Sequence, residues 1–368
     1  MNKGLIIFII ITITITISIS IAFISSRYEA FLSYTRCAEK PVSGLVKEIF
    51  DKHAITKNTD EWDLYIPCGY NGVERELETV VTYDNKQKIF GINGCDKIVS
   101  KNSLWTLLAQ EYGRNQASEI MPETYVLSDA ADMTVFEKKF DANNIYIMKK
   151  NIQRKKGIEL TNDYYKIINA KYNKYRIVQE FKESYLINNR KFNLRYYLLI
   201  VCRDNHTFVY LHKYNKILYT QKTVNGADRL DFASNITNSY DVPDNIYQSH
   251  PYNLKEFSNM VPDATELEPR IQELFKLFSR AIVLPLNNVV SVKDNNKFQL
   301  FGIDIMVDRN MKPYILEINK GPDMKPKDAR DKKMKLKVLN DMFSKMEIIE
   351  IENENENDYN LFEEVYMI

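Results

Sequence analysis

The chain has 368 residues and a net charge of +1, with 50 lysines and arginines against 49 aspartates and glutamates. This balance gives no electrostatic reason to bind nucleic acid, so we expect no nucleic-acid partner. Four cysteines without CxxC spacing and four histidines without an HExxH sequence argue against a disulfide framework and a zinc site. The length allows two or three packed lobes, and we expect a monomer.

The N-terminus contains an uncharged run of apolar, threonine and serine residues at 5–24. A run of this length can span a bilayer as a helix. A cleaved signal peptide is the alternative, but the run is long for one and no clear A-x-A site follows. More basic residues follow the run than precede it, which favours a cytosolic C-terminal side. We therefore expect a single-pass membrane protein, anchored through residues 5–24, with its folded part in the cytosol.

The rest of the chain mixes short strand patterns with helical ones. Ser103 is placed to cap a helix that reaches Tyr112, and a short strand at 121–127 follows. Apolar stripes predict further helices at 266–283 and at about 328–346. The predicted organisation is an anchor at 1–25, a linker at 26–61, a small N-terminal α/β lobe at 62–140, the main lobes at 141–346, and a frayed acidic tail at 347–368.

A basic segment follows a short apolar strand at 145–148. Five of the eight residues at 149–156 are lysine or arginine, and Gly157 closes the segment. Such a segment can form a loop that folds over phosphate groups. A solvated basic hairpin is the alternative, and by itself this pattern favours the hairpin.

The strand predicted at 191–201 has one polar face near its start. Lys191, Asn193 and Arg195 alternate with apolar residues, so their side chains share a face. This face is either a solvated sheet surface or the wall of a nucleotide cleft.

Two further strands are predicted at 298–307 and 314–318, on either side of the turn residues 308–313. If Asp304 lies opposite Glu317, a two-residue loop is centred between Asn310 and Met311. Asp304, Glu317 and Asn319 then project from one face. The opposite face is predicted to carry Ile303, Ile305, Leu316 and Ile318.

Carboxylates inside apolar strands are costly to bury unless they are paired or bind a metal. Asp304, Glu317 and Asn319 offer hard oxygen ligands, which suit Mg²⁺ held together with phosphate oxygens. The alternative is an ordinary exposed hairpin that carries two acids. The basic segment and the polar strand elsewhere in the chain favour the magnesium interpretation.

Several blocks, in this order, resemble the tubulin tyrosine ligase-like family, which has an ATP-grasp fold. Residues 298–319, FQLFGIDIMVDRNMKPYILEIN, are similar to the family pattern FELFGFDxxxDxxxKPWLLEVN and form the most specific block. Residues 177–200, 145–160 and 235–238 resemble further blocks. The resemblance covers roughly residues 62–325 and implies an α/β (α+β) ATP-grasp fold with ATP and Mg²⁺ as cofactors.

The resemblance also implies roles for single residues. Arg154, Lys191 and Arg195 match catalytic positions that contact phosphates or the acceptor. Asp304, Glu317 and Asn319 match the magnesium ligands. The implied ATP-binding residues are Lys101, Lys149, Gln179, Glu180, Phe181, Lys182, Lys191, Asn193, Thr237 and Asn238.

The chain departs from the family pattern at several of these blocks. Asn193 replaces an aspartate, Lys155 a glycine, and Asn235 a histidine. An arginine that helps to hold the incoming amino acid has no evident counterpart, although Lys213 and Lys216 lie nearby in the sequence. The intact set of metal ligands favours a working enzyme.

The implied reaction is the ATP-dependent joining of an amino acid to a carboxylate through an acyl-phosphate. The resemblance implies tyrosine, glutamate or glycine as the free amino acid, and tubulin or another acidic protein tail as the acceptor. An ATP-using catalytic domain also fits the cytosolic side of a membrane. Two alternatives remain open: a non-catalytic, membrane-anchored module that binds nucleotide or acidic tails, and an ATP-grasp ligase with a non-tubulin acceptor.

Overall fold

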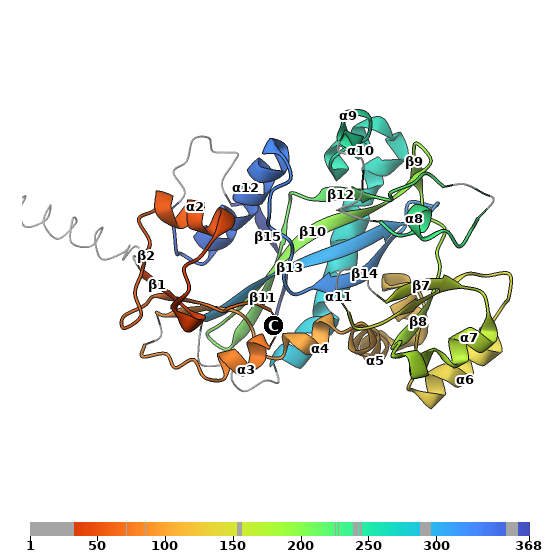
Figure 1. Cartoon of the computed structure of the whole chain (residues 1–368), viewed down its shortest axis with the longest axis horizontal. Coiled ribbons are helices and arrows are strands. Elements are labelled where there is room, and N and C mark those ends of the chain that lie inside the picture. The colour runs from red at the N-terminus through yellow and green to blue at the C-terminus, as the bar shows by residue number, and fades with distance from the viewer. Residues whose placement is uncertain are drawn as a thin grey trace, which may run out of the picture.

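The computed structural model describes residues 33–70, 72–84, 86–152, 157–224, 226, 228–237, 242, 245–287, 296–350 and 360–368. These ranges form a mixed α/β architecture with one large and one small β-sheet (Figure 1). The α/β class expected from the sequence is confirmed.

The large sheet has eleven strands in the described ranges. Its main path, in spatial order, is β15 (Phe362–Met367), β11 (His206–His212), β10 (Arg190–Arg203), β13 (Asn296–Val307), β4 (Lys88–Phe90), β3 (Leu64–Ile66), β1 (Ser33–Arg36) and β2 (Thr56–Lys57). Off this path, β14 (Pro313–Asn319) pairs with β13, while β12 (Lys216–Tyr219) and β9 (Leu186–Ile187) pair with β10.

The small sheet has the antiparallel order β5 (Thr124–Val126), β8 (Ile177–Glu180), β6 (Tyr146–Lys149) and β7 (Ile158–Thr161). The helices α6 (Ala130–Lys139) and α7 (Tyr164–Ile168) lie beside it, at the lower right of Figure 1. Phe136 of α6 and Ile167 of α7 pack against Tyr125 and Met148 of this sheet in a separate small core.

The remaining helices surround the large sheet. They are α2 (Gly44–Lys52), α3 (Val73–Leu77), α4 (Cys95–Val99), α5 (Lys101–Ile120), α8 (Phe232–Asn235), α9 (Ile246–Ser249), α10 (Leu254–Met260), α11 (Leu267–Asn287) and α12 (Ala329–Lys345). Short 3-10 helices are η1 (Cys37–Glu39), η2 (Ala170–Asn173) and η3 (Pro262–Glu266).

The strand β10 is buried on both faces because helices cover the large sheet on both sides. Leu198 and Ile200 lie in the core that contains α5 and α11, whereas Leu199 and Val201 lie in the core that contains α2 and α12. Burying every residue of a central strand favours continuous apolar sequence over alternation. The predicted alternation is confined to residues 191–196, where the strand reaches the small sheet.

The predicted helices at 266–283 and about 328–346 are confirmed as α11 and α12. The helix expected from Ser103 to Tyr112 is longer at both ends. It begins at Lys101 after Ser100 and reaches Ile120, with a break at Gly113, whose φ is +74°. A glycine tolerates this positive φ, so the helix is divided at Gly113 into two segments.

The predicted linker at 26–61 is corrected, because most of it belongs to the folded N-terminal lobe. The strands β1 and β2 join the large sheet, and Phe50 of α2 packs with its ring centroid 5.3 Å from that of Phe343. The predicted frayed tail at 347–368 is corrected in part, since β15 pairs antiparallel with β11. Both segments are held in the fold by contacts with residues that are distant in the sequence.

The predicted membrane localisation is also corrected. Within the described ranges, no helix is both long enough and apolar enough to cross a membrane. The run at 5–24, on which the prediction of a signal anchor rested, lies outside the described residues.

A disulfide links Cys37 to Cys68, contrary to the expectation from cysteine spacing. The strands β1 and β3 are parallel neighbours with Arg36 opposite Ile66, so the residues that follow them emerge together. The two Cα atoms lie 5.2 Å apart, within the range that a disulfide requires. Sequence spacing carries no information about such a pairing because it arises from sheet topology.

We expect reduction of this disulfide to lower the free energy of unfolding by about 3 kcal/mol, because the bond closes a loop across a sequence separation of 31. Thermal unfolding with and without dithiothreitol measures the effect. The double variant Cys37→Ala/Cys68→Ala is the control, since reductant should leave its melting temperature unchanged. An unchanged melting temperature of the wild type in reductant would contradict the prediction.

A buried histidine joins β11 to α12. The backbone N–H of Tyr214 donates to His212 Nδ1 at 3.0 Å, so Nε2 carries the proton and donates to Asp341 at 3.0 Å. Lys337 also donates to Asp341, at 2.8 Å. Burial lowers the pKa of His212, and the Asp341 carboxylate opposes that shift.

We expect this histidine to make the protein less stable as the pH falls below about 6.5. The unfolded chain then binds a proton that the folded imidazole binds less readily, so acid favours unfolding. The pH dependence of the melting temperature, compared between wild type and His212→Gln, tests this. The glutamine donates to Asp341 without titrating, so its curve should be flatter between pH 5 and 7. Superimposable curves would refute the assignment.

Candidate active site

The hairpin β13–β14 brings the two predicted carboxylates together. Asp304 is the register partner of Glu317, as expected, and Asn319 Nδ2 donates to Glu317 Oε1 at 3.3 Å. The predicted two-residue loop between Asn310 and Met311 is wrong. The register shifts by one residue after Asp304, so the turn occupies 308–312, and Met311 adopts a φ of +58°.

This shift is a β-bulge, and it moves Leu316 from its predicted face. Ile305 pairs with Ile315 while Asp304 pairs with Glu317, which leaves Leu316 as the extra residue. A bulge interrupts the alternation of side chains. Leu316 therefore lines the same pocket as Glu317, instead of joining Ile318 in the core.

Arg195 of β10 engages Asp304. The two residues are register partners in the β10–β13 pair, and the guanidinium contacts both carboxylate oxygens, with Nη2 donating to Oδ2 at 2.9 Å. Burial raises the pKa of the Asp304 carboxyl, and the Arg195 charge opposes that shift. The bidentate contact holds the carboxylate in one orientation.

Glu317 lies beside lysines from two other elements. Lys101 Nζ, at the start of α5, lies 3.4 Å from Glu317 Oε2. Although burial would raise the pKa of Glu317, Lys101 and Lys149 lower it to about 2. The carboxylate is therefore ionised at neutral pH and can ligate a cation.

Two lysines bring buried positive charge to the site. Lys149 ends β6, and its Nζ donates to Gln179 Oε1 at 2.7 Å. Lys191 Nζ donates to Asn235 Oδ1 at 2.7 Å and lies 3.9 Å from the centroid of the Phe181 ring. Burial lowers the pKa of each lysine to about 8, so both are mostly protonated at pH 7.

Asn193, on the same face of β10 as Lys191, contacts the segment after α8. Its Nδ2 donates to Thr237 Oγ1 at 2.8 Å. Asn235, noted in the sequence only as a departure from the family pattern, is thus a partner of Lys191. The polar face of β10 is a cleft wall, and the alternative of a solvated sheet surface is excluded.

A pocket with about 750 Å³ of space, part of it open to solvent, lies between the two sheets. Its lining residues are Pro122, Ile147, Lys149, Ile158, Gln179, Glu180, Phe181, Lys182, Ser184, Asn193, Asn235, Ile236, Thr237, Asp304, Met306, Leu316 and Glu317.

Most of the residues predicted from the sequence thus gather at one place. Lys101, Lys191, Arg195 and Asn319 contact its lining side chains directly. Arg154 and Asn238 lie outside the described residues. Carboxylate and amide oxygens that could hold a cation therefore lie beside lysine ammonium groups, next to apolar lining residues.

Sequence reasoning missed the apolar part of the pocket. Met306 lies two residues after Asp304, and Ile147 two residues before Lys149, so strand alternation could have identified both. Pro122 and Ile158 reach the pocket through the small sheet. No local pattern distinguishes these two from ordinary core residues.

The turn after β14 packs tightly against the N-terminal lobe. A Cβ atom added at Gly321 would overlap the ring of Tyr70, so this ring lies directly against the Gly321 backbone. Burial raises the pKa of the Tyr70 hydroxyl to about 12. The contact supports the chain just beyond Asn319.

We expect Gly321→Ala to destabilise the protein by about 1–3 kcal/mol, because the Tyr70 ring must move to admit the methyl group. The melting temperature measures this. Gly69→Ala is the matched control, since a Cβ there meets nothing within 4 Å. Tyr70→Leu should relieve part of the penalty. Equal melting temperatures for the two alanine variants would contradict the packing.

The chain is similar to a family model and to several known proteins of that family. The family model described as the Tubulin-tyrosine ligase family matches residues 81–358. The "Probable tubulin polyglutamylase ttll-9" of Caenorhabditis elegans is 26% identical over 268 residues, which are 64% of this chain and 60% of that protein. Tubulin polyglutamylase TTLL6 of Mus musculus is 24% identical over 321 residues, 77% of this chain and 36% of that protein.

A third relative is tubulin glycylase 3D of Tetrahymena thermophila, which is 24% identical over 226 residues, 54% of this chain and 21% of that protein. The chain therefore spans less than two thirds of the length of each of these three relatives. The family model, however, covers most of the 368 residues. This chain belongs to the tubulin-tyrosine ligase family.

Proposed function

We propose that this protein is an ATP-dependent ligase that joins an amino acid to a carboxylate of tubulin or a similar acidic protein tail. One observation carries the proposal. The oxygen groups of Asp304, Glu317 and Asn319 adjoin the buried lysines at 101, 149 and 191 around a single pocket. Transfer of a phosphoryl group needs both a cation site and fixed positive charge at one place.

The two walls of the pocket support an ATP-grasp arrangement. The small sheet contributes Lys149 and the segment from Gln179 to Lys182, and the large sheet contributes Asn193, Asp304 and Glu317. A purine ring would lie in the apolar slot beside Ile147, Ile158, Phe181, Met306 and Leu316. Its phosphates would then extend toward the lysines and carboxylates.

The donor set fits magnesium. Asp304, Glu317 and Asn319 would supply only oxygen atoms, which Mg²⁺ prefers. The hydrogen bonds from Arg195 and Asn319 use one lone pair on each contacted carboxylate oxygen and leave a second one available. When bound, Mg²⁺ would neutralise phosphate charge during transfer.

In the proposed reaction, a carboxylate oxygen of the acceptor attacks the γ-phosphorus of ATP, and ADP leaves. The amino group of the incoming amino acid then attacks the acyl carbon. An amide bond forms, inorganic phosphate leaves, and the amine proton passes to solvent. Lys149 and Lys191 would stabilise the charge that develops on the phosphoryl oxygens. Arg154 and Asn238 stay predictions for the same site.

The choice of amino acid depends on residues away from the phosphates. Two relatives are named as polyglutamylases and one as a glycylase, which supports glutamate or glycine ahead of tyrosine. Lys213 and Lys216 are poor substitutes for the missing family arginine. Lys213 pairs with Glu363 and Lys216 with Asp331, each at 2.7 Å, and neither lines the pocket.

Incorporation of labelled glutamate, glycine or tyrosine into purified tubulin and into a cell lysate, with ATP and Mg²⁺, tests the proposal. We expect Glu317→Gln to lower the rate at least about 100-fold, because the amide loses the charge that binds the cation. Glu273→Gln, an exposed acid on α11, is the matched control and should retain the wild-type rate.

Three results are informative. Labelling of tubulin supports the whole proposal, and labelling of other lysate proteins alone identifies a ligase with a non-tubulin acceptor. ATP binding without labelling of any acceptor by any of the three amino acids would contradict catalysis. It would favour the non-catalytic binding module that the Asn193 and Lys155 departures allow.

A further inference from the structure

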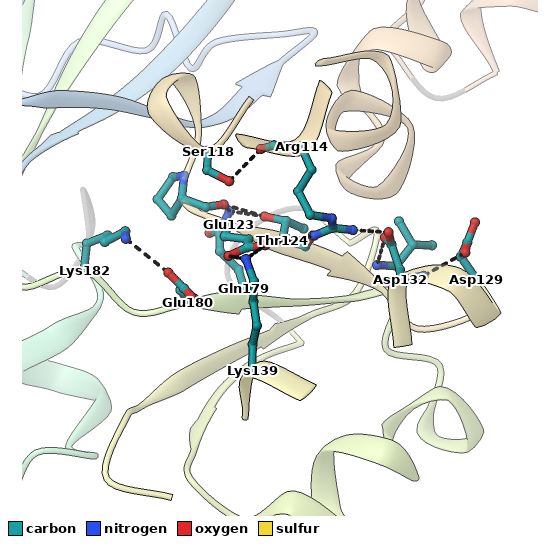
Figure 2. A network of polar contacts seen from close by, with 12 residues as sticks. Arg114, Ser118, Glu123, Thr124, Asp129, Asp132, Lys139, Gln179, Glu180 and Lys182 are labelled. Carbon is teal, nitrogen blue, oxygen red and sulfur yellow. Dashed lines mark hydrogen bonds and ion pairs between the residues drawn. The ribbon is translucent and has the colours of Figure 1, made fainter. Parts of the chain in front are cut away.

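Gln179 is a buried lining residue of the pocket, and both ends of its side-chain amide are engaged. Its Oε1 accepts from Lys149 Nζ at 2.7 Å. Its Nε2 donates to Thr124 Oγ1 at 2.8 Å and to the Pro122 carbonyl at 3.3 Å. Gln179 and Thr124 have no exposed surface, so water is not available to replace either contact. Figure 2 shows Gln179 and Thr124 within this network.

The direction of these hydrogen bonds follows from Thr124. Its hydroxyl has a single proton, which it donates to the Pro122 carbonyl at 2.7 Å. The hydroxyl oxygen can therefore only accept from Gln179, which requires the NH₂ end of the amide at that position. The carbonyl end must then face the Lys149 ammonium.

Thr124 is itself held from the side of α5. Arg114 Nη1 donates to the Thr124 carbonyl at 3.1 Å and lies 3.3 Å from Glu123 Oε1. The guanidinium lies 5.3 Å from the centroid of the Trp105 ring and 5.0 Å from that of Tyr125. Figure 2 shows Arg114 between Thr124 and Asp132, which it also contacts. These contacts fix the strand β5.

We propose that Thr124 and Gln179 act as positioning residues that hold the Lys149 ammonium toward the phosphate end of the pocket. The proposal rests on the proposed function, since it takes ATP as the ligand of this pocket. Without the Thr124 hydroxyl, the amide NH₂ keeps only its longer contact to the Pro122 carbonyl, so the amide is held less firmly. Gln179 Oε1 is the only side-chain acceptor of Lys149 in the described part of the chain, so the ammonium is then positioned less precisely.

This assignment changes the role expected for Gln179. The family resemblance implied that it is one of the ATP-binding residues. Both ends of that amide are already occupied by protein groups. The base-side contacts of the segment therefore belong to Glu180, Phe181 and Lys182, which also line the pocket.

Binding of Mg²⁺·ATP, measured by isothermal titration calorimetry on the full chain, tests the proposal. We expect Thr124→Val to weaken binding about five- to tenfold, because the loss of the hydrogen bond that orients the Gln179 amide loosens the position of the Lys149 ammonium. Thr124→Ser, which restores the hydroxyl, should bind within about twofold of wild type.

Thr161→Val is the matched control for a lost buried hydroxyl. Thr161 is buried in β7 of the same sheet, and its Oγ1 accepts from the Asp163 backbone N–H at 3.1 Å. We expect this variant to have a lower melting temperature and unchanged ATP affinity. If it weakens ATP binding as much as Thr124→Val does, a general loss of sheet stability explains both, and the proposal is overturned.

Gln179→Met provides a second route if Thr124→Val does not fold. It preserves the shape of the side chain, removes both amide ends, and should also weaken ATP binding roughly tenfold. In the double variant, Thr124→Val should add little to Gln179→Met, because both act through one chain of contacts. Additive losses of ATP affinity in the double variant would contradict the positioning role of Thr124 and Gln179.

The binding measurement separates failure of the proposed function from failure of the positioning role. If wild type does not bind Mg²⁺·ATP, both the proposed function and the positioning role of Thr124 and Gln179 are contradicted. If wild type binds and both Thr124→Val and Gln179→Met bind equally well, only the positioning role fails.

Discussion

Three neighbouring strands place Arg195, Asp304 and Glu317 in one lateral row. Asp304 is the register partner of Arg195 on one side and of Glu317 on the other. Isolated carboxylates at these positions would be costly to bury, and the row supplies the compensating charge. The pocket exists where it does because the central strands change here from apolar to charged.

The same strands anchor this row in the buried interior. Further along β10, Leu198 and Leu199 enter two separate cores on opposite faces of the sheet. The charged end of the strand is thus continuous with a segment that is buried in both cores. A site built on such strands holds its ligands more precisely than one built on loops.

The wall of the pocket that the small sheet forms is organised differently. Lys149 comes from a small four-stranded sheet, with its own core of Phe136, Met148 and Val178. Its ammonium is held by a neutral amide, and the nearby carboxylate of Glu317 acts through space. A neutral acceptor fixes position without cancelling the charge that an anionic ligand needs. Lys101 instead pairs with Glu317 directly, so the two lysines are not equivalent.

The sequence by itself determined the local features of the site. Period-two patterns predicted that Asp304 and Glu317 project from one face, and that Lys191, Asn193 and Arg195 share a face. Ordered motif blocks pointed to the family over most of the chain. These features depend on side-chain direction along single strands, which local spacing sets.

Only the tertiary structure decided which distant groups meet. Arg195 and Asp304 are separated by 109 residues, and Cys37 meets Cys68 only because β1 and β3 are neighbours. The bulge after Asp304 moved Leu316 into the pocket, and both ends of the Gln179 amide meet groups on neighbouring strands of the small sheet. In each case the deciding contact comes from another strand or from a break in register, and a local pattern contains neither.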